Sequence, residues 1–236
     1  FQTVREKDIR ILGVSATPFS EITSNQKVVD EDWSLSEKEV LGADHDLESK
    51  VIYPMTPGAR YVGVSDFLRN GNIRFEASPI KPDSCEHVAS VLQQNTEKYD
   101  QKYCVIRTHC AEKDSAMIET LATEHGYDYN PIFGGSKESL DFMDAKPGKR
   151  TIIHICGRFR MGQVVPKDHI GMVYEQSANP NADTVLQGLV GRMCGYHENL
   201  SVDIFVSKTA EDSIRKYAES WNANDPAQLT GISKAM

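Results

Sequence analysis

Short apolar runs alternate with helix-like segments over residues 84–221, and this alternation constrains the fold more than any other feature. Five runs have the length and side chains of buried strands: Tyr103–Thr108, Tyr127–Phe133, Thr151–Cys156, Ile170–Tyr174 and Val202–Val206. The intervening sequence predicts helices at Ser84–Tyr99, Glu112–His125, Ser139–Asp144, Asp183–Cys194 and Ala210–Trp221. Strands that alternate with helices form a mostly parallel sheet flanked by helices, so we expect an α/β fold.

Residues 1–78 have a different pattern from the rest of the chain. The apolar run Ile9–Leu12 predicts a strand, and Glu21–Glu48 is an acidic, polar stretch that we expect at the surface. Pro79 and Pro82 lie among polar residues, a composition typical of domain boundaries. We therefore expect two regions, residues 1–78 and residues 79–236, with the regular alternation in the second.

The composition excludes several classes of protein. No apolar run approaches the roughly 20 residues that cross a bilayer, so we expect no membrane partner. The five cysteines form no Cys-x-x-Cys pair, which favours a reduced intracellular protein over a disulfide scaffold or a zinc site. We therefore expect a cytoplasmic protein without a metal site.

The charge of the chain is unevenly distributed. A formal net charge of −8 argues against a free-standing nucleic-acid binder, because lysine and arginine on phosphates supply most of that affinity. Asp30–Glu48 is strongly acidic, whereas Lys146–Lys167 contains six lysine or arginine residues. The sequence is therefore compatible with a local basic strip on an acidic body.

The segment Gly13–Phe19 reads Gly-Val-Ser-Ala-Thr-Pro-Phe and follows a predicted strand. It resembles motif III of superfamily-two helicases and translocases, whose hydroxyl groups link the state of ATP to the grip on nucleic acid. The resemblance implies a coupling role for Ser15, Ala16 and Thr17. In that family the phosphate-binding loop and the acidic Mg²⁺ box precede this motif, and no Gly-x-x-x-x-Gly-Lys-Ser/Thr loop occurs in the chain. We therefore expect residues 1–78 to be the last part of a first RecA-like domain.

The run Tyr103–His109 is similar to motif IV of the same family, in which a strand end presents polar groups to nucleic acid. The resemblance implies that Arg107 and Thr108 contact a phosphate, a task that suits guanidinium and hydroxyl donors. We assign Thr151, which begins a later strand, to the same nucleic-acid contact. The alternative is a core strand with an arginine at its rim.

The run Ile152–Pro166 is similar to motif V, a strand followed by a glycine-containing loop between nucleotide and nucleic acid. Gly162 would permit a close backbone approach to the nucleotide, and Arg158 or Arg160 could reach a phosphate. The chain departs from the family at Val164, where many members carry an acidic residue. The alternative is an ordinary cationic loop.

The segment Asp183–Tyr196 resembles motif VI, a helix whose glutamine and arginine face the ATP bound on the first domain. The resemblance assigns Gln187 and Arg192 to the γ-phosphate and Gly191 to the nucleotide-facing surface. The spacing departs from the family in two ways: Gln187 and Gly191 are four residues apart instead of three, and Gly195 stands where a second arginine is expected. The alternative is a helix that packs through small residues.

Together, the four blocks resemble motifs III to VI in their family order, and their wording is most similar to phage and large-DNA-virus helicases and to restriction-system motor subunits. The resemblance implies the C-terminal part of an ATP-dependent helicase or translocase, with residues 79–236 as the second RecA-like domain. It implies ATP and Mg²⁺ as cofactors of the intact motor, with none bound tightly by this chain alone, and no ATP hydrolysis by the chain alone. The implied partners are a DNA or RNA backbone and the first RecA-like domain in cis.

A second hypothesis stays open beside the motor. It is a non-catalytic α/β module that binds a protein partner or a nucleotide at the carboxyl ends of its strands. The motor hypothesis requires Arg107, Gly162 and Arg192 to lie together at one edge of the sheet. The non-catalytic hypothesis makes no such demand.

Overall fold

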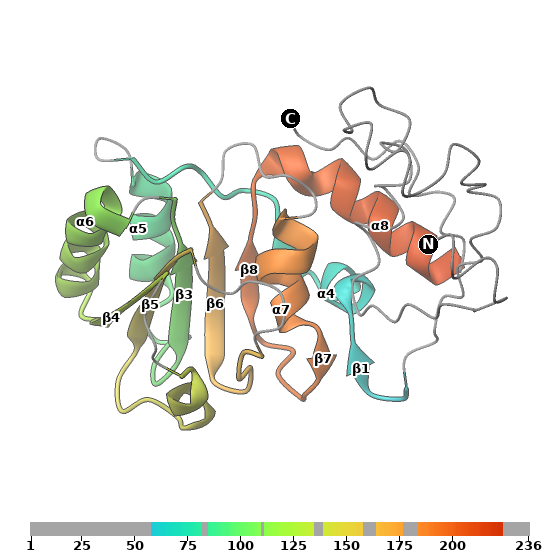
Figure 1. The fold of residues 1–236 in the computed structure, drawn as a ribbon, viewed down its shortest axis with the longest axis horizontal. Helices are drawn as coiled ribbons and strands as arrows, with labels where there is room; N and C mark the ends of the chain where they lie inside the picture. The colour runs from blue at the N-terminus through green and yellow to red at the C-terminus, as the bar shows by residue number, and fades with distance from the viewer. Residues whose placement is uncertain are drawn as a thin grey trace, which may run out of the picture.

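The structure is a computed structural model that describes residues 58–81, 85–109, 111–134, 139–157, 164–176 and 184–223. Within these residues, six strands form one sheet in the order β2-β8-β6-β3-β5-β4, and every neighbouring pair is parallel (Figure 1). The strands are β2 (Ile73–Arg74), β3 (Tyr103–Arg107), β4 (Asp128–Phe133), β5 (Thr151–Cys156), β6 (Ile170–Glu175) and β8 (Asp203–Phe205). The expected α/β architecture is confirmed, and it is consistent with a RecA-like fold.

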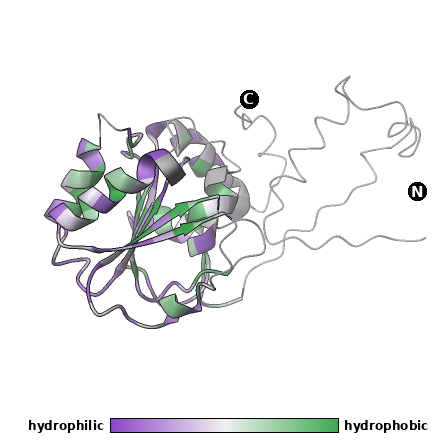
Figure 2. Cartoon of the chain, turned by 60° about the vertical axis from the view of Figure 1, so that its left-hand side comes forward, coloured by the Kyte–Doolittle hydropathy of each residue, from purple (hydrophilic) through white to green (hydrophobic). Residues whose placement is uncertain are grey.

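Helices cover both faces of the sheet (Figure 1). On one face lie α5 (Glu86–Gln94) and α6 (Ala111–Glu124). On the other lie α4 (Val64–Arg69), the 3₁₀ turn η2 (Asp141–Asp144), the π-helix η3 (Thr184–Leu189), α7 (Val190–Met193), the 3₁₀ turn η4 (Lys208–Ala210) and α8 (Glu211–Ala223). The helices in Figure 2 carry both hydrophilic and hydrophobic residues, as helices with one buried face do.

The central strands β3, β5 and β6 are largely apolar because both of their faces are buried. Ile153 and Ile155 of β5 belong to the core cluster that includes residues of α7 and α8, whereas Ile152 belongs to the cluster that includes residues of α5 and α6. All four residues Ile152–Ile155 are fully buried. This two-sided burial explains why the strands appear in the sequence as continuous apolar runs instead of alternating patterns.

The chain leaves β3 and β6 in opposite directions. From β3 it passes through α6 on one face to reach β4, and from β6 it passes through η3 and α7 on the other face to reach β8. Because β3 and β6 are neighbours, their carboxyl ends form a topological switch point. Ligands of open α/β sheets bind in the crevice at such a point.

Residues 58–78 pack into the same unit as the rest of the described chain. β2 pairs with β8, and Phe67 of α4 is completely buried in the core beneath α7 and α8. A short outer strand, β1 (Tyr61–Val62), pairs antiparallel with β7 (Gly195–Tyr196). The stretch around Pro79 is thus part of the connection from β2 to α5, and the boundary expected between residues 78 and 79 does not separate two packed units in the described residues.

The segment expected to be a continuous helix at Asp183–Cys194 has a different structure. Its described part is the π-helix η3 followed by the short helix α7, with non-helical backbone angles at Gly188 (φ −82°, ψ −110°). The segment expected to be a helix at Ser139–Asp144 contains only the single turn η2. Within the described residues, no helix has both the length and the apolar character needed to span a bilayer.

Candidate functional site

An ion pair lies at the switch point between β3 and β6. Arg107 and Glu175 are the last residues of the two strands and face each other in the register of the sheet. Nε of Arg107 lies 2.9 Å from Oε2 of Glu175, and the two side chains are only 14% and 1% exposed. The buried carboxylate of Glu175 therefore holds the Arg107 guanidinium at the switch point through its charge.

The Arg107 guanidinium fills the space beside Gly188. A Cβ atom at Gly188 would lie 2.7 Å from Nη1 and 2.9 Å from Nη2 of Arg107, closer than Cβ atoms approach other heavy atoms. The absence of a side chain at this position is therefore what allows the arginine to lie against the backbone where η3 meets α7.

Arg192 lies on α7, one turn beyond Gly188. Partial burial lowers the pKa of the Arg192 guanidinium, and the positive charge of Arg107 lowers it further. Side chains of a helix lean toward its amino end, which in α7 is the end nearest Gly188 and Arg107. The two arginines therefore lie in each other's electrostatic field beside the switch point.

The extra residue between Gln187 and Gly191 falls in the π-helix η3, whose backbone includes Gln187. A π turn holds one residue more than an α turn, and the backbone of this turn also departs from helical angles at Gly188. A Cβ atom on Gly191 would collide with the carbonyl oxygen of Leu186, five residues earlier. The widened turn thus accounts for both the longer spacing and the need for glycine at position 191.

Thr108 belongs to a buried polar chain. Its Oγ1 hydrogen-bonds Nε2 of His154 at 2.7 Å, and Nδ1 of His154 hydrogen-bonds the Tyr129 hydroxyl at 2.9 Å. That hydroxyl also hydrogen-bonds Oγ of Ser115 at 2.9 Å. Thr108 is only 3% exposed. The structure therefore places its side chain in the core, away from the surface that the sequence comparison assigned to it.

Sequence reasoning missed His154, which lies at the centre of the buried run Ile152–Cys156. Burial lowers the pKa of its imidazole to about 4, while the nearby carboxylate of Asp114 opposes that shift. His154 is therefore neutral near pH 7 and donates from one ring nitrogen while accepting at the other. The available signal was a histidine within an otherwise apolar strand, since such a group needs partners on both ring nitrogens.

Gln176 fixes the loop at the end of β6. Its Oε1 accepts a hydrogen bond of 3.1 Å from the backbone N–H of His109, and its Nε2 donates at 2.6 Å to the carbonyl oxygen of Ile80. The side chain is 8% exposed. These bonds join the end of β3 to the segment before α5, so the switch point has a fixed rim.

Thr151 lies at the amino end of β5, whereas Arg107 lies at the carboxyl end of the neighbouring strand β3. In the parallel register Tyr103 faces Thr151 and Arg107 faces Ile155, so four residues of strand, about 13 Å, separate Thr151 from the switch point. The assignment of Thr151 to the same contact as Arg107 is thus at odds with the fold, because the two residues belong to opposite ends of neighbouring strands.

Several assigned residues lie outside the described part of the chain. These are Ser15, Ala16, Thr17, Arg158, Arg160 and Gly162. Among the described residues, the structure brings together the assigned residues Arg107, Gly191 and Arg192, with Gly188 beside them. Among the described residues, no group of three or more His, Cys, Asp or Glu side chains could hold a metal ion.

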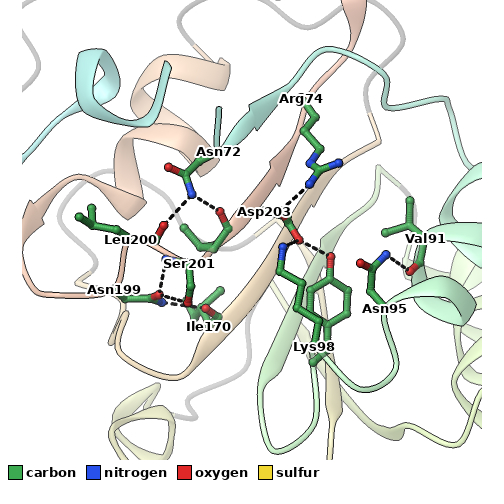
Figure 3. Close-up of polar contacts among 12 residues, drawn as sticks. Asn72, Arg74, Val91, Asn95, Lys98, Ile170, Asn199, Leu200, Ser201 and Asp203 are labelled. Atoms are coloured by element: carbon green, nitrogen blue, oxygen red, sulfur yellow. Dashed lines mark hydrogen bonds and ion pairs between the residues drawn. The ribbon is translucent and has the colours of Figure 1, made fainter. Parts of the chain in front are cut away.

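A second polar cluster surrounds Asp203 at the beginning of β8 (Figure 3). Its carboxylate contacts Arg74 at 3.2 Å, Lys98 at 2.5 Å and the hydroxyl of Tyr99 at 2.8 Å. Asp203 is buried, and burial together with the hydrogen bond to Asp203 raises the pKa of the Tyr99 hydroxyl. Because Asp203 pairs with Met172, three residues before Glu175, this cluster is separate from the switch point.

A protein of Acanthamoeba polyphaga mimivirus, described as "Uncharacterized protein L594", is 38% identical to this chain over 58 residues. The match covers 25% of this chain and 15% of the viral protein, so this chain spans a small part of that protein's length. No protein-family model matches the chain.

Proposed function

We propose that the chain is the second RecA-like half of an ATP-driven nucleic-acid helicase or translocase, in which Arg192 serves the nucleotide. One observation carries this proposal: Arg107 and Arg192, drawn from two sequence blocks 85 positions apart in the chain, lie together at the switch point of a parallel sheet. The motor hypothesis requires Arg107, Gly162 and Arg192 to lie together, and Gly162 lies outside the described residues.

In the proposed motor, the first RecA-like domain holds ATP with Mg²⁺ through its phosphate loop. Arg192 approaches the γ-phosphoryl group across the cleft and stabilises the negative charge that develops during transfer. An arginine in this role is worth roughly 10³–10⁵ in rate. The guanidinium is suited to the task because it stays protonated, even where burial and Arg107 lower its pKa.

The contact with nucleic acid is the part of the proposal with less structural support. Thr108 is buried and Thr151 lies at the far edge, so neither supports it. The contact is therefore assigned to Arg158 and Arg160, with Ser15–Thr17 for coupling, all of which lie outside the described residues. The proposed partner remains a DNA or RNA backbone.

Two observations support the proposed viral or phage branch and the proposed intracellular compartment. The short match to a mimivirus protein agrees with the phage or large-DNA-virus branch suggested by the motifs. Cys85, Cys104, Cys156 and Cys194 are free thiols, as expected of a protein from a reducing, intracellular compartment such as a host cytoplasm.

The test is nucleic-acid-stimulated ATP hydrolysis. The chain alone should show none, and activity should appear when a domain with a phosphate loop is joined to it or added. In that assembly, Arg192→Ala should lower kcat by 10³-fold or more while ATP binding is retained. Arg215→Ala, an arginine on the outer surface of α8, is the matched control and should retain activity. Robust hydrolysis by the chain alone that survives Arg192→Ala would overturn the proposal.

A non-catalytic module that binds a nucleotide or a protein is the second candidate. The observation that favours it is the buried ion pair between Arg107 and Glu175. An arginine whose charge is neutralised within the protein can have a structural role and need not bind a ligand. This candidate predicts that Arg192→Ala weakens ligand binding and that no hydrolysis appears with any phosphate-loop domain. The ATPase measurement therefore separates the two.

A further inference from the structure

We infer that Arg107 is a positioning residue that clamps the widened turn carrying Arg192, instead of a ligand of nucleic acid. The inference rests on the proposed function for the role of Arg192, but the clamp itself rests on contacts of the described residues. Three features carry it: the ion pair that holds Arg107, the gap at Gly188 that receives it, and the short helix that depends on that gap.

The first feature is the fixed end of the clamp. Glu175 is 1% exposed, and its Oε2 lies 2.9 Å from Nε of Arg107, so its buried charge holds the guanidinium at the switch point. Both residues end central strands of the sheet. The terminal nitrogens of Arg107, Nη1 and Nη2, lie beside Gly188.

The second feature is the receiving gap. Both terminal nitrogens of Arg107 lie within 3 Å of the position that a Cβ of residue 188 would occupy. The space that a side chain at residue 188 would need is occupied by Arg107.

The third feature is the dependence of α7 on its surroundings. A helix of four residues has almost no stability of its own, because helix nucleation is unfavourable. Val190 and Met193 are buried in the core and hold one side of α7. The Arg107 guanidinium lies at the beginning of the same segment. The position of Arg192 is thereby coupled to the ends of β3 and β6.

The experiment is a double-mutant cycle between positions 107 and 188, measured by urea unfolding of the full chain. Gly188→Ala should raise the unfolding constant at least threefold more when Arg107 is present than in the Arg107→Ala background, where the guanidinium no longer occupies the space. Gly148→Ala is the matched control, because a Cβ there meets nothing within 4 Å, and it should change the constant less than twofold in both backgrounds. Equal effects of Gly188→Ala in both backgrounds would overturn the clamp.

Hydrogen exchange provides a second readout that does not depend on the folding of the Gly188 variant. Arg107→Ala should speed amide exchange in residues 188–193 at least tenfold, Arg107→Lys should restore part of the protection, and Arg215→Ala should leave it unchanged. Uniform acceleration over the whole sheet, or none in residues 188–193, would contradict a positioning role.

Binding of inorganic tripolyphosphate separates this inference from the proposed function. If the wild-type chain binds the probe, Glu175→Gln should weaken binding at least fivefold although Glu175 itself repels the anion, because the clamp is loosened. A stronger binding would instead show that Glu175 acts only through its charge, and would count against the clamp. If the wild type does not bind tripolyphosphate, as the motor hypothesis expects of this half alone, the unfolding cycle decides the clamp.

Discussion

Buried polar side chains show how individual residues are matched in this fold. Asp203 contacts two cationic side chains and a hydroxyl, and Glu175 forms an ion pair with Arg107. His154 forms a hydrogen bond at each ring nitrogen. Each group would lose its hydration on burial, and an unsatisfied partner costs about 1–3 kcal/mol or more. These contacts therefore help to specify which strands lie next to one another, and they contribute to the stability of the protein.

The acid dependence of stability should depend on His154. Its folded-state pKa of about 4 lies below the ordinary value of 6.5, so the folded protein disfavours the protonated ring. Stability from this group is complete above pH 6.5 and is lost as the pH falls toward 4, because only the unfolded chain takes up the proton. Lowering the pH from 7.5 to 5 should remove about 2 kcal/mol of unfolding free energy through this residue.

Urea unfolding at the two pH values measures this loss. His154→Gln should be less stable at pH 7.5 but should show a smaller loss at pH 5 than the wild type. His109→Gln, whose side chain is exposed, is the control and should show the wild-type loss. An unchanged pH dependence in His154→Gln would mean that other groups govern the acid response.

At the scale of elements, the π-helix η3 is where sequence and structure differ most. Apolar spacing predicted the central strands because each is buried on both faces, and β5 was predicted at its observed bounds. The same spacing predicted one helix over Asp183–Cys194, because an extra residue in a turn leaves no signature in the pattern of apolar side chains. The resemblance did indicate the anomaly, as a spacing of four residues instead of three from Gln187 to Gly191, but not its structural form.

Gly191→Ala tests whether the widened turn is required. The added methyl would meet the carbonyl oxygen of Leu186, a backbone atom that cannot rotate away, so the turn must rearrange. We expect a loss of at least about 2 kcal/mol in unfolding free energy. Gly148→Ala, in open space, should cost less than about 1 kcal/mol in the same urea titration. Equal costs would indicate that η3 adapts without strain.

The candidate site was predictable only in part, for reasons visible in single residues. Arg107 and Arg192 could be paired from sequence because the carboxyl ends of parallel strands share an edge. The burial of Thr108 could not, since its partner His154 is 46 residues away and lies on a different strand. Thr151 was assigned by analogy, and only the register of β5 against β3 shows that it lies at the amino ends of the strands, away from Arg107.

At the scale of the whole molecule, the described chain forms one packed unit from residue 58 onward. Proline and polar residues near position 79 resemble a linker, yet β2 and α4 on their amino-terminal side belong to the sheet and its core. The composition of a segment indicates that it lies at the surface, but it does not indicate whether the segment connects two elements of one domain or two domains. A crossover loop and a domain linker therefore look alike in sequence.

Removal of residues 1–78 tests this unity. The shortened chain loses Phe67 and Ile73, which are buried against α8 and β8, and should lose the cooperative thermal transition of the full chain. Phe67→Ala in the full chain is the milder comparison and should cost about 3–5 kcal/mol in unfolding free energy. A sharp transition at an unchanged midpoint in the shortened chain would show that residues 79–236 are an independent domain.

The place of β8 in the sheet has a consequence for how the protein is made. β8 lies between β2 and β6, although it is the last strand of the described chain, and Ile73 pairs with Ile204 across 131 positions of sequence. During synthesis β2 leaves the ribosome early and must wait for β8 before it has a neighbour. Closing so large a loop is slow. The edge of β6 thus stays open until β8 has been synthesised, and the nascent chain is most vulnerable to aggregation in that interval.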